Sequence, residues 1–184
     1  PNPDQADADR DGIGDACDDD FCYVVKDAAN CLDPLGSFKI YSPATDATTG
    51  ESVRLRLFAN RSNQPMRYRW TVVEAPQGSG ATIDNPSGAV TVSQKFEYLY
   101  LKDSVVTFTP DKAGTYKLHM VAELVWEDEV TGLEGAQAES YVLVEVSGPS
   151  LASAGCNATG AQFGSLFSIL LALAGFAVHL RRRK

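Results

Sequence analysis

The sequence predicts a mainly β protein whose central part is an antiparallel β-sandwich. Between residues 37 and 146, short runs of alternating apolar and polar residues are separated by Gly, Pro and Asn. Seven or so such runs occur in about 110 residues, and no helical period interrupts them. This is the pattern of two packed antiparallel sheets. An acidic stretch precedes this region, and one long apolar segment follows it.

Strands are expected where the side-chain period is two. The runs 53–57 and 68–72 alternate apolar residues with Arg and Thr, so each has one buried face. Further strands are expected near residues 89–92, 96–101, 104–109, 115–126 and 138–146. The turn signals between strands are Gln77-Gly78-Ser79-Gly80, Asn85-Pro86, Pro110-Asp111 and Thr131-Gly132.

Aromatic residues are expected in the core. Trp70 lies in the expected strand 68–72, at a place where a sandwich often buries its tryptophan, and Tyr116 is placed after Asp111 as in a tyrosine corner. Phe96, Tyr98 and Tyr100 share one side of a strand and could form a platform for sugar rings. Because the other side of that strand is also largely apolar, packing in the core is the favoured interpretation.

Four arginines form outward rows on two expected strands and could attract an acidic polymer: Arg54, Arg56, Arg67 and Arg69. The favoured interpretation is that they pair with outward glutamates, at little gain in stability, the candidates being Glu123, Glu139 and Glu145. Asn60-Arg61-Ser62 and Asn157-Ala158-Thr159 match glycosylation acceptors, which we interpret as coincidence.

The segment from Asp7 to Asp18, D-A-D-R-D-G-I-G-D-A-C-D, has the spacing of a Ca²⁺-binding loop. Gly12 permits the sharp turn, and Ca²⁺ takes roughly six to eight oxygen ligands. An EF-hand is excluded, because the prolines before the loop disfavour a helix and no apolar helical face follows it. A disordered acidic segment is the alternative. The predicted ligands are the carboxylates of Asp7, Asp9, Asp11, Asp15 and Asp18 and the backbone carbonyl of Ile13.

Three of the four cysteines, Cys17, Cys22 and Cys31, lie within a segment too polar to bury much surface. Such usage indicates disulfides and an oxidising compartment. Zinc binding is the alternative, although spacings of four and eight intervening residues are not those of the usual zinc sites.

With its flank, the acidic loop resembles the thrombospondin type 3 repeat, a calcium-wrapped, disulfide-tied module. The resemblance covers Pro1 to Asp18. Family repeats usually continue into another acidic unit, whereas here the acidic pattern stops after Asp20, so the resemblance implies the last repeat of an array. Family members carry a cysteine just before the position of Pro1. The resemblance therefore implies upstream domains and an upstream partner for Cys17, which leaves Cys22 to pair with Cys31.

Three stretches of the central region look like the PKD family of immunoglobulin-like domains: Y-R-W-T-V-V-E-A-P-Q-G-S-G-A-T-I, F-T-P-D-K-A-G-T-Y-K-L and Y-V-L-V-E-V. The resemblance covers roughly residues 37–147. One departure is that the family's W-D-F-G-D-G signature is replaced by Trp70-Thr71-Val72-Val73-Glu74. The family implies an extracellular spacer or contact module, and the sandwich by itself supplies no function.

The C-terminal part is predicted to form a flexible linker followed by a membrane helix. Ala161 to Leu180 are twenty mostly apolar residues, followed by R-R-R-K. Twenty helical residues span about 30 Å, the thickness of the hydrocarbon core. The basic cluster predicts a cytoplasmic C-terminus, with everything before the helix outside. A buried globular helix is the alternative.

Gly155-Cys156, a spacer, the apolar helix and the terminal arginines together resemble the MYXO-CTERM sorting signal of myxobacterial surface proteins. The resemblance implies processing near Cys156, lipid attachment at that residue, and transfer to the bacterial cell surface or outer membrane, facing outward.

Charge and residue types exclude several functions. Residues 1–34 carry a net charge of −8, which is the formal charge of the whole chain, so nucleic acid is not an expected partner. The only histidines are His119 and His179, and no nucleophile elbow, phosphate loop or metal-binding histidine cluster accompanies them. We therefore expect no enzymatic activity from this chain.

These observations predict four parts: a calcium-binding repeat and disulfide segment (1–34), a PKD-like sandwich (35–147), a linker (148–160) and a transmembrane helix with a basic tail (161–184). The predicted function is that of a non-enzymatic, calcium-binding structural or adhesion protein of the cell surface. Its expected partners are the membrane, upstream domains, and a surface polysaccharide or protein. The alternatives are the anchoring and spacer end of a larger secreted hydrolase, or a carbohydrate-binding module.

Overall fold

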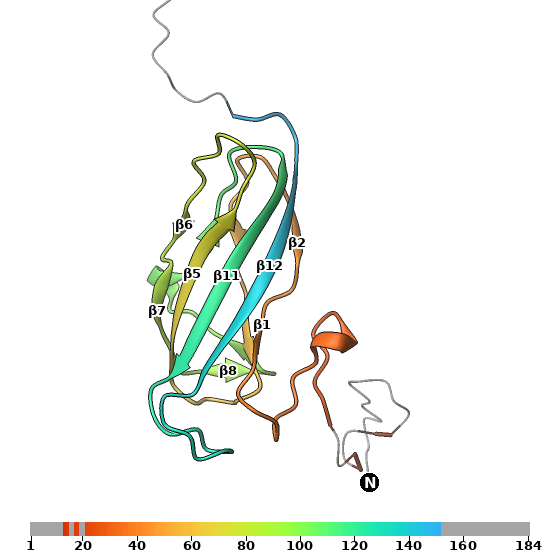
Figure 1. The fold of residues 1–184 in the computed structure, drawn as a ribbon, viewed down its shortest axis with the longest axis vertical. Coiled ribbons are helices and arrows are strands. Elements are labelled where there is room, and N and C mark those ends of the chain that lie inside the picture. The colour runs from red at the N-terminus through yellow and green to blue at the C-terminus, as the bar shows by residue number, and fades with distance from the viewer. Residues whose placement is uncertain (1–12, 15–16, 19–20, 152–184) are drawn as a thin grey trace, which may run out of the picture. The chain divides into compact units, whose positions relative to one another are not determined.

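The computed structural model describes residues 13–14, 17–18 and 21–151, which belong to one compact unit, Pro1–Leu151. These residues are mainly β (Figure 1). Their helices are two single 3-10 turns, η1 (Ala28–Asn30) and η2 (Lys102–Ser104). The predicted mainly β sandwich is confirmed. No helix of the described part is long and apolar enough to cross a membrane; the predicted helix, 161–180, lies outside that part.

One layer of the sandwich is a five-stranded sheet with the order β2-β12-β11-β5-β7. Its long strands lie side by side across the front of Figure 1. In β5, residues 66, 68 and 70 are buried and the alternate arginines are exposed, so the predicted period of two is confirmed there. The strands are β2 (Thr45–Thr48), β5 (Met66–Glu74), β7 (Ser87–Val90), β11 (Gly114–Leu124) and β12 (Gln137–Ser147).

The other layer is divided into two smaller sheets of short strands. The first has the order β1-β4-β9-β8 and the second β3-β10-β6. The expected strand 53–57 is therefore split, because β3 and β4 pair in different sheets and residues 55–56 belong to neither. The strands are β1 (Ile40–Tyr41), β3 (Val53–Arg54), β4 (Leu57–Ala59), β6 (Ile83–Asp84), β8 (Ser93–Gln94), β9 (Glu97–Tyr98) and β10 (Thr107–Phe108).

The core between the layers is contributed by both. Burial of these apolar side chains supplies the main driving force for the fold, at roughly 25 cal/mol per Å² of apolar surface removed from water. Trp70 is buried as expected. The largest completely enclosed members of this core are Tyr98, Tyr116, Phe108, Leu55, Leu57, Met66, Leu118, Met120 and Leu124.

The sequence predicted an antiparallel sandwich, but one pair of strands in the structure is parallel. Strand β2 runs parallel to β12, with Thr45 opposite Val144 and Thr48 opposite Ser147. The reason is a change of layer: β1 pairs with β4 in the small sheet, and after the Ser42-Pro43-Ala44 segment the chain continues as β2 on the edge of the large sheet. Pro43 has no N–H to offer a ladder, which suits the crossing point.

The predicted strand 96–101 is also wrong in its extent. Lys95 and Phe96 form the two-residue turn between β8 and β9, with φ angles of 48° and 63°. Only Glu97–Tyr98 joins the ladder, and η2 follows shortly after. Hairpin turns with two positive φ angles usually carry Asn or Gly, and neither residue here has that signature. The sequence therefore gave no signal for this turn.

Candidate functional site: the junction of the disulfide loop with the sandwich

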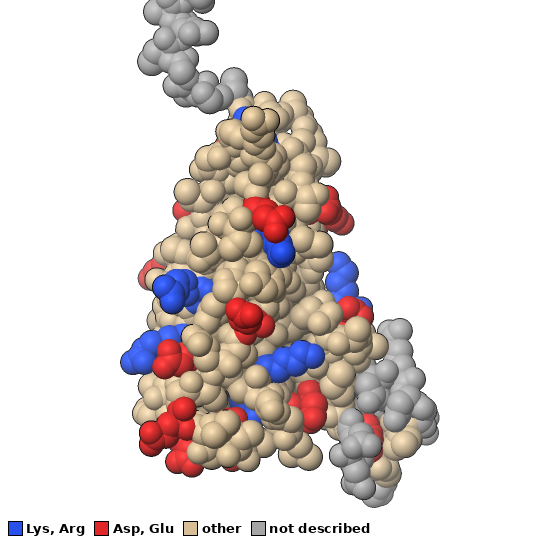
Figure 2. Space-filling model, viewed as in Figure 1, with Lys and Arg blue, Asp and Glu red and all other residues tan. Residues whose placement is uncertain are grey.

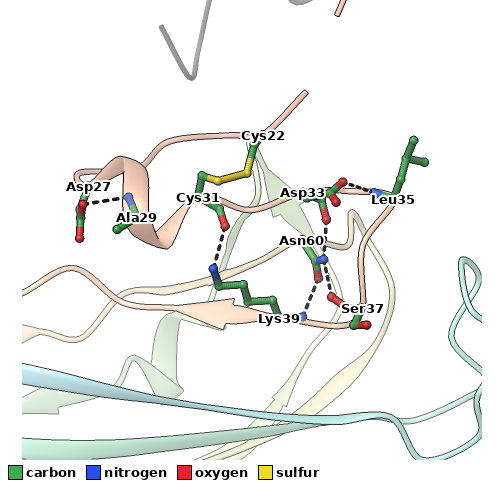
Figure 3. Close-up of a disulfide and its surroundings, with 9 residues drawn as sticks. All are labelled: Cys22, Asp27, Ala29, Cys31, Asp33, Leu35, Ser37, Lys39 and Asn60. Carbon is green, nitrogen blue, oxygen red and sulfur yellow. Dashed lines mark hydrogen bonds between the residues drawn. A yellow bond between two sulfur atoms is a disulfide. The ribbon is translucent and has the colours of Figure 1, made fainter. Parts of the chain in front are cut away.

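The predicted disulfide between Cys22 and Cys31 is present and closes a small loop that precedes the sandwich in the chain (Figure 3). Inside it, Asp27 caps η1: its carboxylate accepts the Ala29 N–H at 3.0 Å and the Asn30 side-chain amide at 2.7 Å. A backbone bridge between Tyr23 and Leu32, with N to O distances of 3.0 and 2.9 Å, lies next to the disulfide. The loop thus has its own internal bonds.

Asn60, at the end of β4, ties the chain after this loop to the sandwich (Figure 3). Its side-chain amide donates to the carbonyls of Asp33 at 2.5 Å and Ser37 at 2.8 Å, while its Oδ1 accepts the Lys39 N–H at 2.8 Å. Asn60 is only 1% exposed. All of its side-chain bonds therefore go to the segment between the disulfide and β1, and the Asn60 glycosylation match is indeed a coincidence, because this amide is enclosed.

Arg61 and Asp128 form a buried ion pair directly beside Asn60. Arg61 Nε lies 2.5 Å from Asp128 Oδ1, and a second guanidinium nitrogen lies 2.8 Å from Oδ2, so the contact is bidentate. The two side chains are 3% and 0% exposed. The remaining guanidinium donors reach the carbonyls of Pro34 at 3.2 Å and Gly36 at 2.9 Å. One arginine thus connects the N-terminal segment, β4 and the loop after β11.

The carboxylate of Asp128 is fixed from its own loop as well. It accepts the Thr131 hydroxyl at 2.7 Å and the Val130 N–H at 3.3 Å. The hydrogen bonds from Arg61, followed by those from Thr131 and Val130, hold the pKa of the Asp128 carboxyl well below its ordinary value, against the opposing effect of burial. We call Asn60, Arg61 and Asp128 the junction cluster.

A small apolar contact completes the junction. Leu32 and Phe58 are buried, but neither belongs to the core between the sheets. The ring of Tyr23 packs at a tilt against that of Phe96, a turn residue with positive φ, with 5.0 Å between the ring centroids. Lys39 adds a bond from its ammonium to the Cys31 carbonyl at 3.0 Å. The disulfide loop is therefore docked on the outer side of the small sheet β1-β4-β9-β8.

Little in the sequence pattern indicates this cluster. In the sequence, Asn60 and Arg61 belong to a glycosylation match, and Asp128 lies in a short acidic run, residues 127–129, with no feature that links it to Arg61. Arg61 and Asp128 are 67 positions apart in the chain. A pair of opposite charges at such a separation has no periodic signal, so only the fold identifies it.

Most of the predicted calcium ligands lie outside the described residues: Asp7, Asp9, Asp11 and Asp15. Ile13 and Asp18 are described, and Ile13 is exposed. Within the described part, no group of three or more His, Cys, Asp or Glu side chains could hold a metal ion. Calcium binding therefore stays a prediction.

The remaining predicted cysteine positions are not tested. Cys17 is exposed and forms no disulfide with a described cysteine, and Cys156 lies outside the described residues.

Two of the three aromatic residues considered as a sugar platform, Tyr98 and Tyr100, belong to the core, whereas Phe96 is half-buried in the turn between β8 and β9 and contacts Tyr23. Tyr98 is 0% exposed, and its hydroxyl donates to the Gln64 carbonyl at 2.9 Å. Burial raises the pKa of the Tyr98 hydroxyl to about 12. Tyr100 is buried as well and packs edge-on against Tyr68. The favoured interpretation, packing in the core, is thus confirmed for Tyr98 and Tyr100, whose enclosed rings present no face to a ligand.

The arginine rows pair differently from the prediction. Arg54 and Arg56 both contact Glu97, at 3.2 and 2.5 Å. Among the described residues, Arg67 and Arg69 have no ion pair. The expected glutamate partners are otherwise engaged: His119 lies against Glu139 at 2.9 Å, and Glu145 accepts the Thr115 hydroxyl. Glu123 is in no ion pair with a described residue.

At the other end of β11, the expected tyrosine corner is present. The Tyr116 hydroxyl lies 3.0 Å from Asp111 Oδ1 and accepts the Lys112 N–H at 3.1 Å. Ser79 donates to the same carboxylate at 2.5 Å, and the Gly80 N–H donates to its other oxygen at 2.8 Å. The bonds from Ser79 and Gly80 lower the pKa of Asp111 to about 2. We call Ser79, Asp111 and Tyr116 the corner cluster.

The exposed face of the large sheet carries mixed charges. Figure 2 shows Lys and Arg interspersed with Asp and Glu over this face. Lys117 contacts Glu74 at 3.2 Å and also lies over the ring of Tyr141, which stacks on His119. No charge of a single sign dominates this face, so it does not select a strongly charged partner.

No protein-family profile matches the sequence, and no curated protein sequence matches it. Solved structures with related architecture include a PapD-like domain of human CEP192, at 13% identity and a TM-score of 0.35, over 65% of this chain and 89% of that one. A conjugative transposon lipoprotein from Bacteroides eggerthii has 14% identity and a TM-score of 0.33, with 58% and 95% covered.

The third ScaB cohesin of R. flavefaciens, solved with a dockerin, has 16% identity and a TM-score of 0.36, over 61% of this chain and 96% of that one. All of these TM-scores are low. The likeness therefore carries no argument about activity or partners, and the assignment of a β-sandwich is based on the sheets and core of this chain.

Proposed function

We propose that this chain is a non-enzymatic, calcium-binding structural or adhesion module of the bacterial cell surface. It would consist of a thrombospondin type 3-like repeat, a PKD-like β-sandwich, and a MYXO-CTERM-like anchor with processing and lipid attachment at Cys156. The partners are the membrane and domains upstream of Pro1. The outer envelope is a compartment in which a disulfide such as that between Cys22 and Cys31 persists.

The observation that supports this proposal best is the fixed junction between the disulfide loop and the sandwich. Arg61 is enclosed and bonds to Asp128, Pro34 and Gly36. Buried charges with several partners hold one geometry, because any movement would leave a charge unpaired in a medium of low dielectric constant. A connection of this kind transmits orientation from a repeat to a spacer, which is what a mechanical module requires.

Calcium would stiffen the part before this junction. Carboxylates of Asp7, Asp9, Asp11, Asp15 and Asp18 repel one another without a cation, and a bound Ca²⁺ offsets that repulsion. Weak extracellular sites have dissociation constants of roughly 10⁻⁴–10⁻³ M, a range that calcium outside cells can fill. The repeat, the disulfide loop and the sandwich would then act as one rod.

Calorimetric titration of the full chain with calcium chloride tests this proposal. We expect binding heat that is lost on Asp9→Ala combined with Asp11→Ala, since these two positions supply adjacent ligands of the loop. The matched control is Asp19→Ala combined with Asp20→Ala, which removes the same charge outside the ligand spacing and should leave the heat in place. Equal heats for the two double variants would contradict the proposed site.

A further inference from the structure

A cavity of about 290 Å³ lies where the disulfide loop meets the sandwich. One wall is formed by Val25 and Lys26 of the disulfide loop, and the other by residues 42–45 and 54–56 of the sandwich. Its size is at the lower end of small-molecule sites, which run from roughly 300 to 1,000 Å³. The cavity has room for one sugar unit or another small polar group.

The charges around this cavity are mainly positive. Lys26, Arg54 and Arg56 all line it, and no acidic residue does. Glu97 contacts both arginines, and the hydrogen bond from Arg56 lowers the pKa of the Glu97 carboxyl, so this residue is an anion at neutral pH. Three cations against one anion leave two positive charges. The sign is opposite to that of the chain as a whole, whose net charge is −8.

The acids next in sequence to the lining residues are not themselves part of the lining. Asp27 follows Lys26, but both of its oxygens are engaged within the disulfide loop by Ala29 and Asn30. Asp46 follows Thr45 and is not part of the lining. An anionic group of a ligand can therefore enter without meeting a carboxylate at the wall.

The cationic groups are held in place and retain donors. Arg56 lies over the ring of Phe58 at 4.6 Å and Arg54 over that of Tyr100 at 5.9 Å, while the Lys26 ammonium donates to the Ala44 carbonyl at 2.8 Å. A guanidinium carries five N–H donors. Among the described residues, Glu97 is the only hydrogen-bond or ion-pair partner of the two guanidinium groups. Most of their donors are thus available to a ligand.

We propose that this cavity binds a carboxylate-bearing sugar, such as one uronic acid unit of an acidic surface polysaccharide. Planar guanidinium groups bind carboxylates in a bidentate manner. The rest of the lining combines apolar residues, Val25 and Pro43, with hydroxyl-bearing Ser42 and Thr45. A sugar ring presents the same combination, an apolar face with hydroxyls at its edge. This ligand would give the sandwich an adhesive role that does not depend on calcium.

The test is calorimetric titration of the full chain, in buffer with EDTA, with an oligomer of galacturonic acid and with a neutral glucose oligomer of equal length. We expect the acidic oligomer to bind and the neutral one not to. Arg54→Gln combined with Arg56→Gln should weaken binding at least about tenfold, because charge-assisted hydrogen bonds are lost. The matched control, Arg67→Gln combined with Arg69→Gln on the other sheet, should keep the affinity.

A second variant, Lys26→Gln, keeps both arginine pairs with Glu97 and should still weaken binding several-fold. Thermal unfolding of each variant checks that it is folded. Unchanged affinity in both cavity variants, or equal binding of the neutral oligomer, would overturn the proposal. Inorganic phosphate is a further probe: if it competes at the same concentration as the acidic oligomer, the cavity is a plain anion site and the assignment to a sugar is wrong.

Discussion

The two ends of strand β11 carry polar clusters that stabilise the molecule in different ways. Tyr116, near the start of β11, belongs to the corner cluster, and all members of that cluster lie within one end of the sandwich. The junction cluster lies past the other end, where Asp128 meets Arg61. The corner cluster closes a turn of the sandwich itself, whereas the junction cluster attaches a separate segment to it.

The two clusters also differ in the kind of polar groups that they contain. The corner cluster depends on hydroxyl and backbone donors around the one carboxylate of Asp111. The junction cluster contains an enclosed cation and anion. Removing one partner of a buried ion pair costs more than removing a hydroxyl, because the remaining charge is left without compensation. We therefore expect substitutions in the junction cluster to lower the free energy of unfolding more than substitutions in the corner cluster.

Arg61→Met is expected to have the largest effect. Asp128 would remain buried without its cation, and the carbonyls of Pro34 and Gly36 would lose their donors. We expect the free energy of unfolding to fall by about 3–5 kcal/mol, as measured by urea denaturation. The control is Arg69→Met, an exposed arginine on β5, which should change stability by less than about 0.5 kcal/mol.

If Arg61→Met lost no more stability than its control, the junction would not be fixed by this pair. A double variant that also carries Asp128→Leu sharpens the result. It removes both charges, so it should recover part of the loss seen with Arg61→Met alone.

Tyr116→Phe is expected to have an intermediate effect. The ring remains packed against Phe108 at 5.1 Å, but the hydroxyl between Asp111 and Lys112 is lost. We expect a decrease of about 1–2 kcal/mol in the free energy of unfolding. Tyr141→Phe on the exposed sheet face is the matched control, with an expected change of less than about 0.5 kcal/mol. A larger loss for Tyr116→Phe than for Arg61→Met would reverse the comparison.

Acidification should weaken both clusters gradually. The pKa values of Asp111 and Asp128 are lower in the folded chain than the ordinary 3.8, so both carboxylates stabilise the fold above that pH. Their contribution is lost as the pH falls, for Asp111 down to its folded pKa of about 2. Thermal unfolding between pH 6 and about 2 should show this decline, and Asp111→Asn should flatten it. An equally steep decline in Asp111→Asn would count against a role for this carboxylate.

The sequence predicted the elements that depend on local pattern. The period of two located β5, β11 and β12 within a few residues, and the residues from Asp111 to Tyr116 predicted the tyrosine corner, though not the part of Ser79 in it. Both signals are short in range. The disulfide between Cys22 and Cys31 was implied by the resemblance of the preceding repeat, and it is present.

Other features had no local signal. The turn at Lys95 and Phe96 lacks the usual residues, and the parallel pairing of β2 with β12 depends on which layer the chain enters after Pro43. The arginines of the small sheets were predicted to face glutamates of the large sheet, but Glu97 on β9 lies closer. Partner choice among exposed charges follows from strand order, which alternation alone does not specify.

The sequence by itself therefore determined the fold class, the buried faces of the long strands and the acidic loop that predicts calcium binding, because each rests on spacing within a single segment. Only the tertiary structure decided that the segment after the disulfide loop is held by Arg61, which pairs with Asp128, and that Lys26 meets Arg54 and Arg56 around one cavity. These groups come from segments far apart in the chain, and only the packing of the layers brings their charges within reach of one another.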